Sequence, residues 1–499
     1  MKKLLLVSVL FMSLLAVSCS QPSNVISRSQ DNWLADSVPS IKQTYSDTFD
    51  YIGLAVEYGN FGLKYTGNNK YTGTYTHDKS WGTPSELYYS EVQQGISKHA
   101  NTITLGNELK PQFLLQWWDG NDSSQSKKTF TASNGKTIDV PDKLNGEALI
   151  YATLNAAKKS GVKMRGHVLT WHSQTPEGFF RENYSKNGAL VSKEVMTARH
   201  EWYIKTVLDC VAQWEIHNGY AGKETGNHLI WAWDVVNEAM ADDASDPSTD
   251  SWLRGSTAGT NQNWLRGSTS ETQGKDPANG GSRWYEIYKN EDFIINAFRF
   301  ANAYAPADVK LCYNDYNEYM TNKTSAIEHI ARMIKAGEAQ SIAGKSVSPR
   351  LDAIAMQSHV GSSWPSITEY ENALKKFLAI ADVHVSELDI SAASSSEAAT
   401  AYANYFKMLK KYGKNYSGNK ITCVTIWGIN NESSWINPST NYNTGEKYKS
   451  YPLLFTIVDN VAKTKKEVQY TSGTEFLPQY DLGDTYDTNN SFWAVINSH

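Results

Sequence analysis

The sequence WAWDVVNEA, Trp231 to Ala239, is the stretch from which the fold can be predicted. Its centre is apolar and β-branched at Val235 and Val236, and it ends in the polar pair Asn237 and Glu238. An apolar run without polar alternation is typical of a strand in a parallel sheet that is covered on both faces. In α/β barrels the chemically active residues lie at the carboxyl ends of such strands. We therefore expect Glu238 at the mouth of a barrel.

A second stretch, VHVSELDI at 383–390, has the same form and places Glu387 near the end of another apolar run. A single glutamate at a strand end is more often a solvated acid than a catalytic group. Two glutamates in matching positions instead predict the pair of carboxyl groups that cleaves glycosidic bonds. Glu238 and Glu387 are therefore the candidate catalytic residues.

Strand and helix patterns alternate through residues 47–475, which we expect to be one catalytic domain. Alternation of this kind indicates a parallel sheet with crossover helices, and eight such units close into a (β/α)8 TIM barrel. Besides the two strands with the glutamates, strands are expected at 48–58, 101–105, 162–169, 309–313, 351–356 and 421–427. Helices are expected at 85–99, 145–160, 193–214, 284–303, 324–336, 366–379 and 395–412.

One segment, 242–282, interrupts this alternation. It is rich in Gly, Ser, Thr, Asn and Asp and contains the sequence WLRGST twice, from Trp252 and from Trp264. Two short copies are too few for a repeat architecture. We expect a surface loop insertion outside the catalytic machinery. Residues 476–499 are expected to form a C-terminal extension.

Residues 1–19 have the features of an export signal, because two lysines precede an apolar run that is too short to span a bilayer. The small residues before Cys19 resemble a bacterial lipobox, which predicts lipidation of Cys19 and a lipoprotein at the cell surface or facing the periplasm. Ala16 stands where that motif more often has Leu, so a secreted protein with an ordinary signal is the alternative. The polar residues 20–46 are expected to be a flexible tether.

Composition limits the class of partner. The 499-residue chain has a formal net charge of −5, so neither nucleic acid nor an anionic membrane surface is an expected partner, and membrane contact would come only through the lipid anchor. Its 16 Trp and 29 Tyr supply flat rings that can stack on sugars. Cys210, Cys312 and Cys423 follow no disulfide or metal-ligand spacing and are expected to be small buried residues. We expect a monomer without metal or cofactor.

Six motifs at the predicted strand ends resemble the endo-β-1,4-xylanases of glycoside hydrolase family 10. They follow the order of that family and cover roughly residues 48–460. The motifs are RGHVLTWHSQTP (165–176), WDVVNEA (233–239), YNDYN (313–317), MQSH (356–359), VSELDI (385–390) and WGINNESSW (427–435). The resemblance implies that xylan and xylo-oligosaccharides are the substrates.

The resemblance also implies a retaining double displacement with Glu387 as nucleophile and Glu238 as acid and base. Retention needs two carboxyl groups about 5 to 5.5 Å apart, one of them charged while the other keeps its proton. Asn237 would bind the 2-hydroxyl of the sugar that is cleaved. His359 would hydrogen-bond to Glu387 and be oriented by Asp389.

The other implied site residues are contacts to the sugars. Gln357 would be the amide beside the two carboxyl groups, and His167 and Trp171 would contact the cleaved sugar and its neighbour. Asn107 and Lys110 would donate hydrogen bonds to the next sugar out. Trp427 and Trp435 would form apolar walls of the site. Trp233 and Asp234 lie earlier in their strand, so packing and a structural hydrogen bond are expected from them.

Two positions depart from the family pattern. Gly106 stands where the family usually has a glutamate that binds the distal sugar, and Asn431 stands where it usually has an aspartate. Two other functions stay open: a retaining cellulase or mannanase on the same barrel, and a surface glycan-binding lipoprotein without turnover. Only a xylanase would exclude a hydroxymethyl group at C5, and Trp435 and Lys110 are the candidates for that exclusion.

Overall fold

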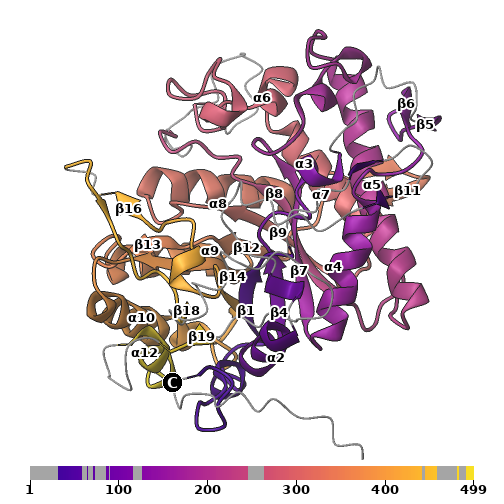
Figure 1. The fold of residues 1–499 in the computed structure, drawn as a ribbon. Coiled ribbons are helices and arrows are strands. Elements are labelled where there is room, and N and C mark those ends of the chain that lie inside the picture. Colours follow the sequence, from indigo (N-terminus) through magenta and orange to yellow (C-terminus); the bar gives the residue numbers. More distant parts are fainter. Residues whose placement is uncertain are drawn as a thin grey trace, which may run out of the picture.

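Eight parallel strands form a closed barrel at the centre of the molecule (Figure 1). The computed structural model describes residues 32–58, 64–65, 71–72, 86–88, 90–115, 126–244, 263–440, 444–457, 480–482 and 490–499. Each barrel strand pairs with the next along the chain, and the last pairs with the first, which confirms the expected (β/α)8 TIM barrel. The strands are β1 (Tyr51–Val56), β4 (Thr102–Leu105), β7 (Lys163–Trp171), β8 (Ile230–Asn237), β9 (Lys310–Asp315), β12 (Ala353–Met356), β14 (Asp382–Ser391) and β15 (Ile421–Ile426).

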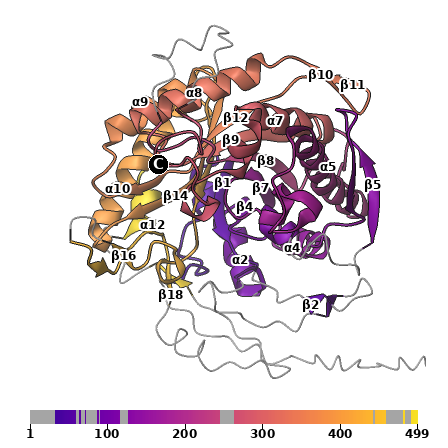
Figure 2. The same ribbon diagram turned by 90° about the horizontal axis from the view of Figure 1, so that it is seen from above.

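Helices surround these strands, as the view from above shows (Figure 2). Side-chain caps start several of them: Ser192 caps α5, and Ser366 forms a capping box with Glu369 at α9. The single helix expected at 284–303 is instead two helices, because Lys289 adopts a φ of 60° and ends the first. The helices are α2 (Ser90–His99), α4 (Glu147–Lys159), α5 (Lys193–His217), α6 (Arg283–Tyr288), α7 (Asp292–Tyr304), α8 (Thr321–Ala336), α9 (Ile367–Leu378) and α10 (Ser395–Leu409).

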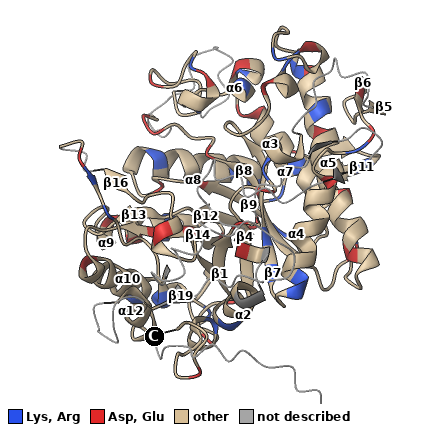
Figure 3. Cartoon of the chain, in the orientation of Figure 1, with Lys and Arg blue, Asp and Glu red and all other residues tan. Residues whose placement is uncertain are grey.

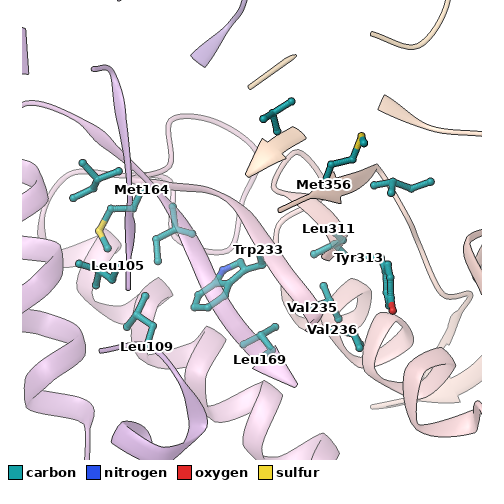
Figure 4. Packing of buried hydrophobic residues seen from close by; sticks show 14 of the residues in the cluster. Leu105, Leu109, Met164, Leu169, Trp233, Val235, Val236, Leu311, Tyr313 and Met356 are labelled. Atoms are coloured by element: carbon teal, nitrogen blue, oxygen red, sulfur yellow. The ribbon is translucent and has the colours of Figure 1, made fainter. Parts of the chain in front are cut away.

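Six strand residues, Trp231, Ala232, Cys312, Ala353, Ala355 and Cys423, form a small apolar cluster of their own. Most other apolar side chains of the strands pack into one large core (Figure 4). Trp233 of β8 is fully buried within it, and a Cβ atom on Gly166 of the adjacent strand β7 would lie 2.3 Å from the Trp233 ring. The packing expected of Trp233 is therefore confirmed and requires glycine at position 166. The cysteines at 210, 312 and 423 are free and buried, as expected.

The flexible tether expected at 20–46 is wrong from residue 32 onward. Trp33 is fully buried and stacks on His99 of α2, where Gly95 leaves room for its ring. Tyr45 follows the short helix α1 (Ile41–Thr44), and its hydroxyl donates to the carbonyl of Val495 at 2.6 Å, in the C-terminal helix α12 (Ser491–Ile496). These few large apolar residues bind the segment to the barrel despite its polar composition. The expected export signal, Cys19 and the start of the tether lie outside the described residues.

The surface loop expected at 242–282 is also wrong for its second WLRGST sequence. Trp264 and Leu265 are fully buried, and Leu265 forms a β-bridge with Met240 directly after β8. Trp252 and the first copy lie outside the described residues.

In Figure 3, Lys and Arg are interspersed with Asp and Glu over the ribbon. Within the described ranges, no helix has the length and apolarity needed to cross a membrane.

Candidate active site

The carboxyl ends of the barrel strands open into a cleft of about 1350 Å³. The side chains that we expected in the site come from six of the eight barrel strands or the segments after them, and all of them line this cleft. Across the described ranges, no group of three or more His, Cys, Asp or Glu side chains could hold a metal ion. The expected residues in the cleft are Asn107, Lys110, His167, Trp171, Asn237, Glu238, Gln357, His359, Glu387, Asp389, Trp427 and Trp435.

Glu387, in β14, is buried and held from both sides. Asn314 Nδ2 donates to Glu387 Oε1 at 2.7 Å, and His359 Nε2 lies 3.3 Å from Oε2. Burial alone would raise the pKa of this carboxyl group. The hydrogen bond from His359, together with the electrostatic effects of His167 and His359, outweighs burial and lowers the pKa of Glu387 to about 2. Glu387 is therefore a carboxylate over the whole neutral and mildly acidic range.

His359 carries the positive charge that Glu387 needs. Burial disfavours the charged ring, but the carboxylates of Asp389 and Glu387 raise the pKa of His359 well above its usual range. Its Nδ1 lies 2.8 Å from Asp389 Oδ1, so the expected contacts to both acids are present. Asp389 also accepts a hydrogen bond from Trp435 Nε1 at 2.8 Å, which places the Trp435 ring edge-on to His359.

Glu238, directly after β8, accepts hydrogen bonds on its side chain from three uncharged donors among the described residues. Trp171 Nε1 donates to Oε2 at 2.9 Å. Asn237 Nδ2 and Gln357 Nε2 both donate to Oε1, at 3.1 and 3.0 Å. In the part of the chain that the structure describes, no charged side chain donates a hydrogen bond to this carboxyl group, whereas Glu387 has the charged His359 beside it.

The backbone of Glu238 has an unusual conformation and is held by hydrogen bonds on both its amide and its carbonyl. Its φ of 55° lies in the left-handed region, which side-chain-bearing residues seldom adopt. The amide of Glu238 donates to the carbonyl of Asn314 at 2.9 Å, and the carbonyl of Glu238 accepts from Arg266 Nε at 2.8 Å. Arg266 also donates to the hydroxyl of Tyr316 at 2.9 Å. Arg266 belongs to the second WLRGST sequence, which we had placed outside the catalytic machinery because of its loop-like composition.

Two amides connect the carboxyl groups. Asn314 Nδ2 donates to Asn237 Oδ1 at 2.8 Å as well as to Glu387, and Gln357 Nε2 donates to Asn237 Oδ1 at 3.0 Å. The chain Glu387, Asn314, Asn237, Glu238 therefore joins the pair without a charged group between them. Asn314 lies in the YNDYN motif but was not singled out, because an asparagine in a strand end has no signature of its own.

A buried ion pair supports this arrangement inside the barrel. Arg165 donates to both carboxylate oxygens of Asp234, and His167 Nδ1 lies 2.9 Å from Asp234 and 4.0 Å from Glu387. The structural hydrogen bond expected of Asp234 is thus confirmed. Since both charges are desolvated, loss of either partner would leave an unpaired charge in the core.

A polar row leads from Glu238 toward β4. Lys110 Nζ lies 4.8 Å from the Trp171 ring centroid and donates to Asn107 Oδ1 at 3.1 Å and to Gln174 Oε1 at 2.9 Å. Gln174, which we did not place in the site, is needed to hold Lys110. Trp435, which also lines the cleft, is 65% exposed and can contact a ligand.

Asn431, one of the two departures from the family pattern, has a structural contact. Its Oδ1 accepts a hydrogen bond from the amide of Leu453 at 2.8 Å, and its own amide donates to the carbonyl of Phe455 at 2.9 Å. An aspartate could accept the same bond. This substitution therefore leaves the loop in place.

A parallel barrel whose mouth holds two connected glutamates is the architecture of a glycoside hydrolase. Residues 60–468 match the family model described as glycosyl hydrolase family 10, so the chain belongs to this family.

Curated relatives are named as xylanases. The bifunctional endo-1,4-beta-xylanase XylA of Ruminococcus flavefaciens is 33% identical over 68% of this chain and 28% of that protein. Endo-1,4-beta-xylanase Y of Acetivibrio thermocellus is 31% identical over 79% of this chain and 31% of that protein. Endo-1,4-beta-xylanase A of Butyrivibrio fibrisolvens is 30% identical over 70% of this chain and 72% of that protein. The chain thus spans less than a third of the length of the first two.

Among solved structures, the CBM22-1 and GH10 modules of the Clostridium thermocellum endo-1,4-beta-D-xylanase 10B, complexed with xylohexaose, are similar in fold and sequence. The TM-score is 0.59 and the identity is 27%, over 92% of this chain and 67% of that chain.

Proposed function

We propose that this protein is an endo-1,4-β-xylanase that cleaves xylan and xylo-oligosaccharides with retention of configuration at the anomeric carbon. The observation that carries the proposal is the different surroundings of two connected glutamates: Glu387 is kept ionised by His359, and Glu238 is surrounded by uncharged donors. The names of the family relatives support xylan as the substrate.

In the first step, a carboxylate oxygen of Glu387 attacks the anomeric carbon. The glycosidic bond breaks, and its electron pair stays on the departing oxygen, which takes the proton from Glu238. The products are a glycosyl ester on Glu387 and a shortened xylan chain. Asn237 lies between the two carboxyl groups, where its amide can bind the 2-hydroxyl of the reacting sugar.

In the second step, Glu238 removes a proton from water, and the resulting oxygen attacks the anomeric carbon. The ester bond breaks, and Glu387 regains its charge. Esterification has removed that charge in the meantime, so a negative Glu238 no longer faces a second negative carboxylate. Two inversions give net retention.

Two residues that line the cleft are candidates for the selection of pentose units. Lys110, held by Asn107 and Gln174, and the exposed ring of Trp435 both line the cleft, and we propose that they exclude a C5 hydroxymethyl group. We further propose that the chain is exported, is lipidated at Cys19 and acts as a monomer at the cell surface or facing the periplasm. Mass spectrometry of the membrane fraction tests the lipidation.

The activity is tested with the protein lacking residues 1–20 on soluble arabinoxylan and on carboxymethyl-cellulose. We expect short xylo-oligosaccharides from arabinoxylan alone, and loss of this activity in Glu238→Gln and in Glu387→Gln. Equal cleavage of the cellulose would contradict the substrate. Binding of xylan without cleavage by the wild-type protein would contradict the enzymatic function.

A further inference from the structure

The carboxylate of Glu57, directly after β1, occupies the space beside Gly106, directly after β4. A Cβ atom on Gly106 would lie 2.1 Å from Glu57 Oε1, so a side chain at position 106 would require this carboxylate to move. In this structure the Glu57 carboxylate thus fills the space that a side chain at position 106 would take. Both residues line the cleft.

Glu57 belongs to the polar row that begins at Glu238. Trp171 donates to Glu238, Lys110 lies over the Trp171 ring, and Lys110 donates to Asn107. Asn107 Nδ2 in turn donates to Glu57 Oε1 at 3.0 Å. Glu57 is thus the outermost member of the row, beyond the groups that reach the reacting sugar.

The surroundings of Glu57 are acidic. The amide of Tyr58 donates to Glu108 at 2.7 Å, and the amide of Glu57 itself donates to Glu86 at 3.2 Å. Burial and the charge of Glu108 raise the pKa of Glu57 well above its usual range, although the charge of Lys110 opposes the shift. A carboxyl group that keeps its proton more readily can donate a hydrogen bond as well as accept one, which suits the hydroxyl groups of a sugar.

We propose that Glu57 binds a hydroxyl group of the sugar next to the cleaved one, on the β1 and β4 side of the cleft, and so contributes to specificity for chains of two or more sugars on that side. This inference rests on the proposed xylanase function. The binding carboxylate is supplied by β1 in this chain, and Gly106 leaves the space that it needs.

The test compares nitrophenyl β-xylobioside, which reaches this sugar site, with nitrophenyl β-xyloside, which does not. The measured quantity is the ratio of kcat/KM for the two substrates. In Glu57→Ala we expect this ratio to fall roughly ten- to hundredfold, as for loss of a hydrogen bond to an ionisable group. Glu57→Gln preserves size and should fold even if the alanine variant does not; its ratio should fall by less. Glu224→Ala, an exposed glutamate outside the cleft, is the matched control, and its ratio should equal that of the wild type.

A second pair of variants tests the exchange between strands. Gly106→Glu alone should lower the ratio because the two side chains collide, and the double variant Glu57→Ala with Gly106→Glu should recover it. The proposal would be overturned if both Glu57 variants lost kcat/KM equally on the two substrates, so that the ratio did not change. It would also be overturned if the ratio of the double variant were no higher than that of Glu57→Ala. Failure of the xylanase function itself would look different, because the wild-type protein would then cleave neither substrate.

Discussion

Glu387 and Glu238 lie in one cleft and are linked through the amides of Asn314 and Asn237, yet the protein controls them by different means. Glu387 is controlled through its side chain, by a charged histidine and an asparagine amide. Glu238 is controlled through its backbone, by a left-handed φ and by Arg266 on its carbonyl. The difference teaches that a nucleophile needs a stabilised charge, whereas a group that both gives and takes a proton needs a fixed position with uncharged neighbours.

The largest effect is expected from removal of the nucleophile. Glu387→Ala should lower kcat/KM on xylan by on the order of 10⁴-fold or more, because no covalent step can start. Added azide should restore cleavage of an activated aryl xylobioside and yield the α-azide, since azide attacks from the side that Glu387 leaves open. A β-azide from this variant would contradict the assignment.

Removal of the acid should have an effect that depends on the leaving group. In Glu238→Ala we expect a roughly 10²- to 10⁴-fold loss on xylan. The first step on a dinitrophenyl xylobioside should change far less, because dinitrophenolate departs without a proton. Pre-steady-state release of dinitrophenolate measures this step, with Glu224→Ala as a control. Equal losses on both substrates would show that Glu238 has another role.

The pH dependence tests the charge on Glu387. Its pKa of about 2 lies below the usual 4.5, so protonation should inactivate the wild-type enzyme only in strong acid. His359→Ala removes both the donor and the charge, which raises the pKa of Glu387. The acid limb of kcat/KM should therefore move to higher pH, with a roughly ten- to hundredfold loss of activity at neutral pH. An unmoved acid limb would show that His359 does not stabilise the carboxylate.

The smallest effect is expected at Arg266, a positioning residue that acts through the backbone of Glu238. Arg266→Met should lower kcat on xylan roughly tenfold, as for loss of a hydrogen bond, and the dinitrophenyl substrate should be less affected in its first step. Arg266→Lys should recover part of the loss. Thermal unfolding of each variant distinguishes a positioning role from an effect on stability. If activity fell by the same factor on both substrates and Tm fell in parallel, Arg266 would have a structural role only.

The barrel could be predicted from the sequence because buried parallel strands are apolar along their whole length and end in polar residues, as at 231–239. The catalytic carboxyl groups followed from the same pattern, since both glutamates stand where such a run ends. The prediction of a flexible tether was wrong from residue 32 onward, and the prediction of a surface loop was wrong at the second WLRGST sequence. In both segments a few large apolar residues fix the structure although the composition is polar. Trp33 and Trp264 each bury a large ring, and no average over polar neighbours reveals that.

Other parts of the site depend on contacts between strands. Glu57 acquires its place from Gly106, 49 positions away in the chain, and the sequence showed only a missing glutamate at 106. Asn314 and Gln174 have ordinary polar side chains, which become site residues only because β4, β7, β8, β9 and β14 converge on one cleft. Arg266 contacts a main-chain carbonyl, and such a contact leaves no side-chain pattern to recognise.

The measurement that tests the division of roles most directly is to trap the covalent intermediate with a 2-deoxy-2-fluoro xylobioside that carries a good leaving group. The fluorine slows both steps, and the leaving group lets the first one proceed, so the sugar accumulates on the nucleophile. Peptide mass spectrometry of the labelled protein should find the sugar on Glu387 and none on Glu238. A label on Glu238, or turnover with inversion and no label at all, would contradict the account.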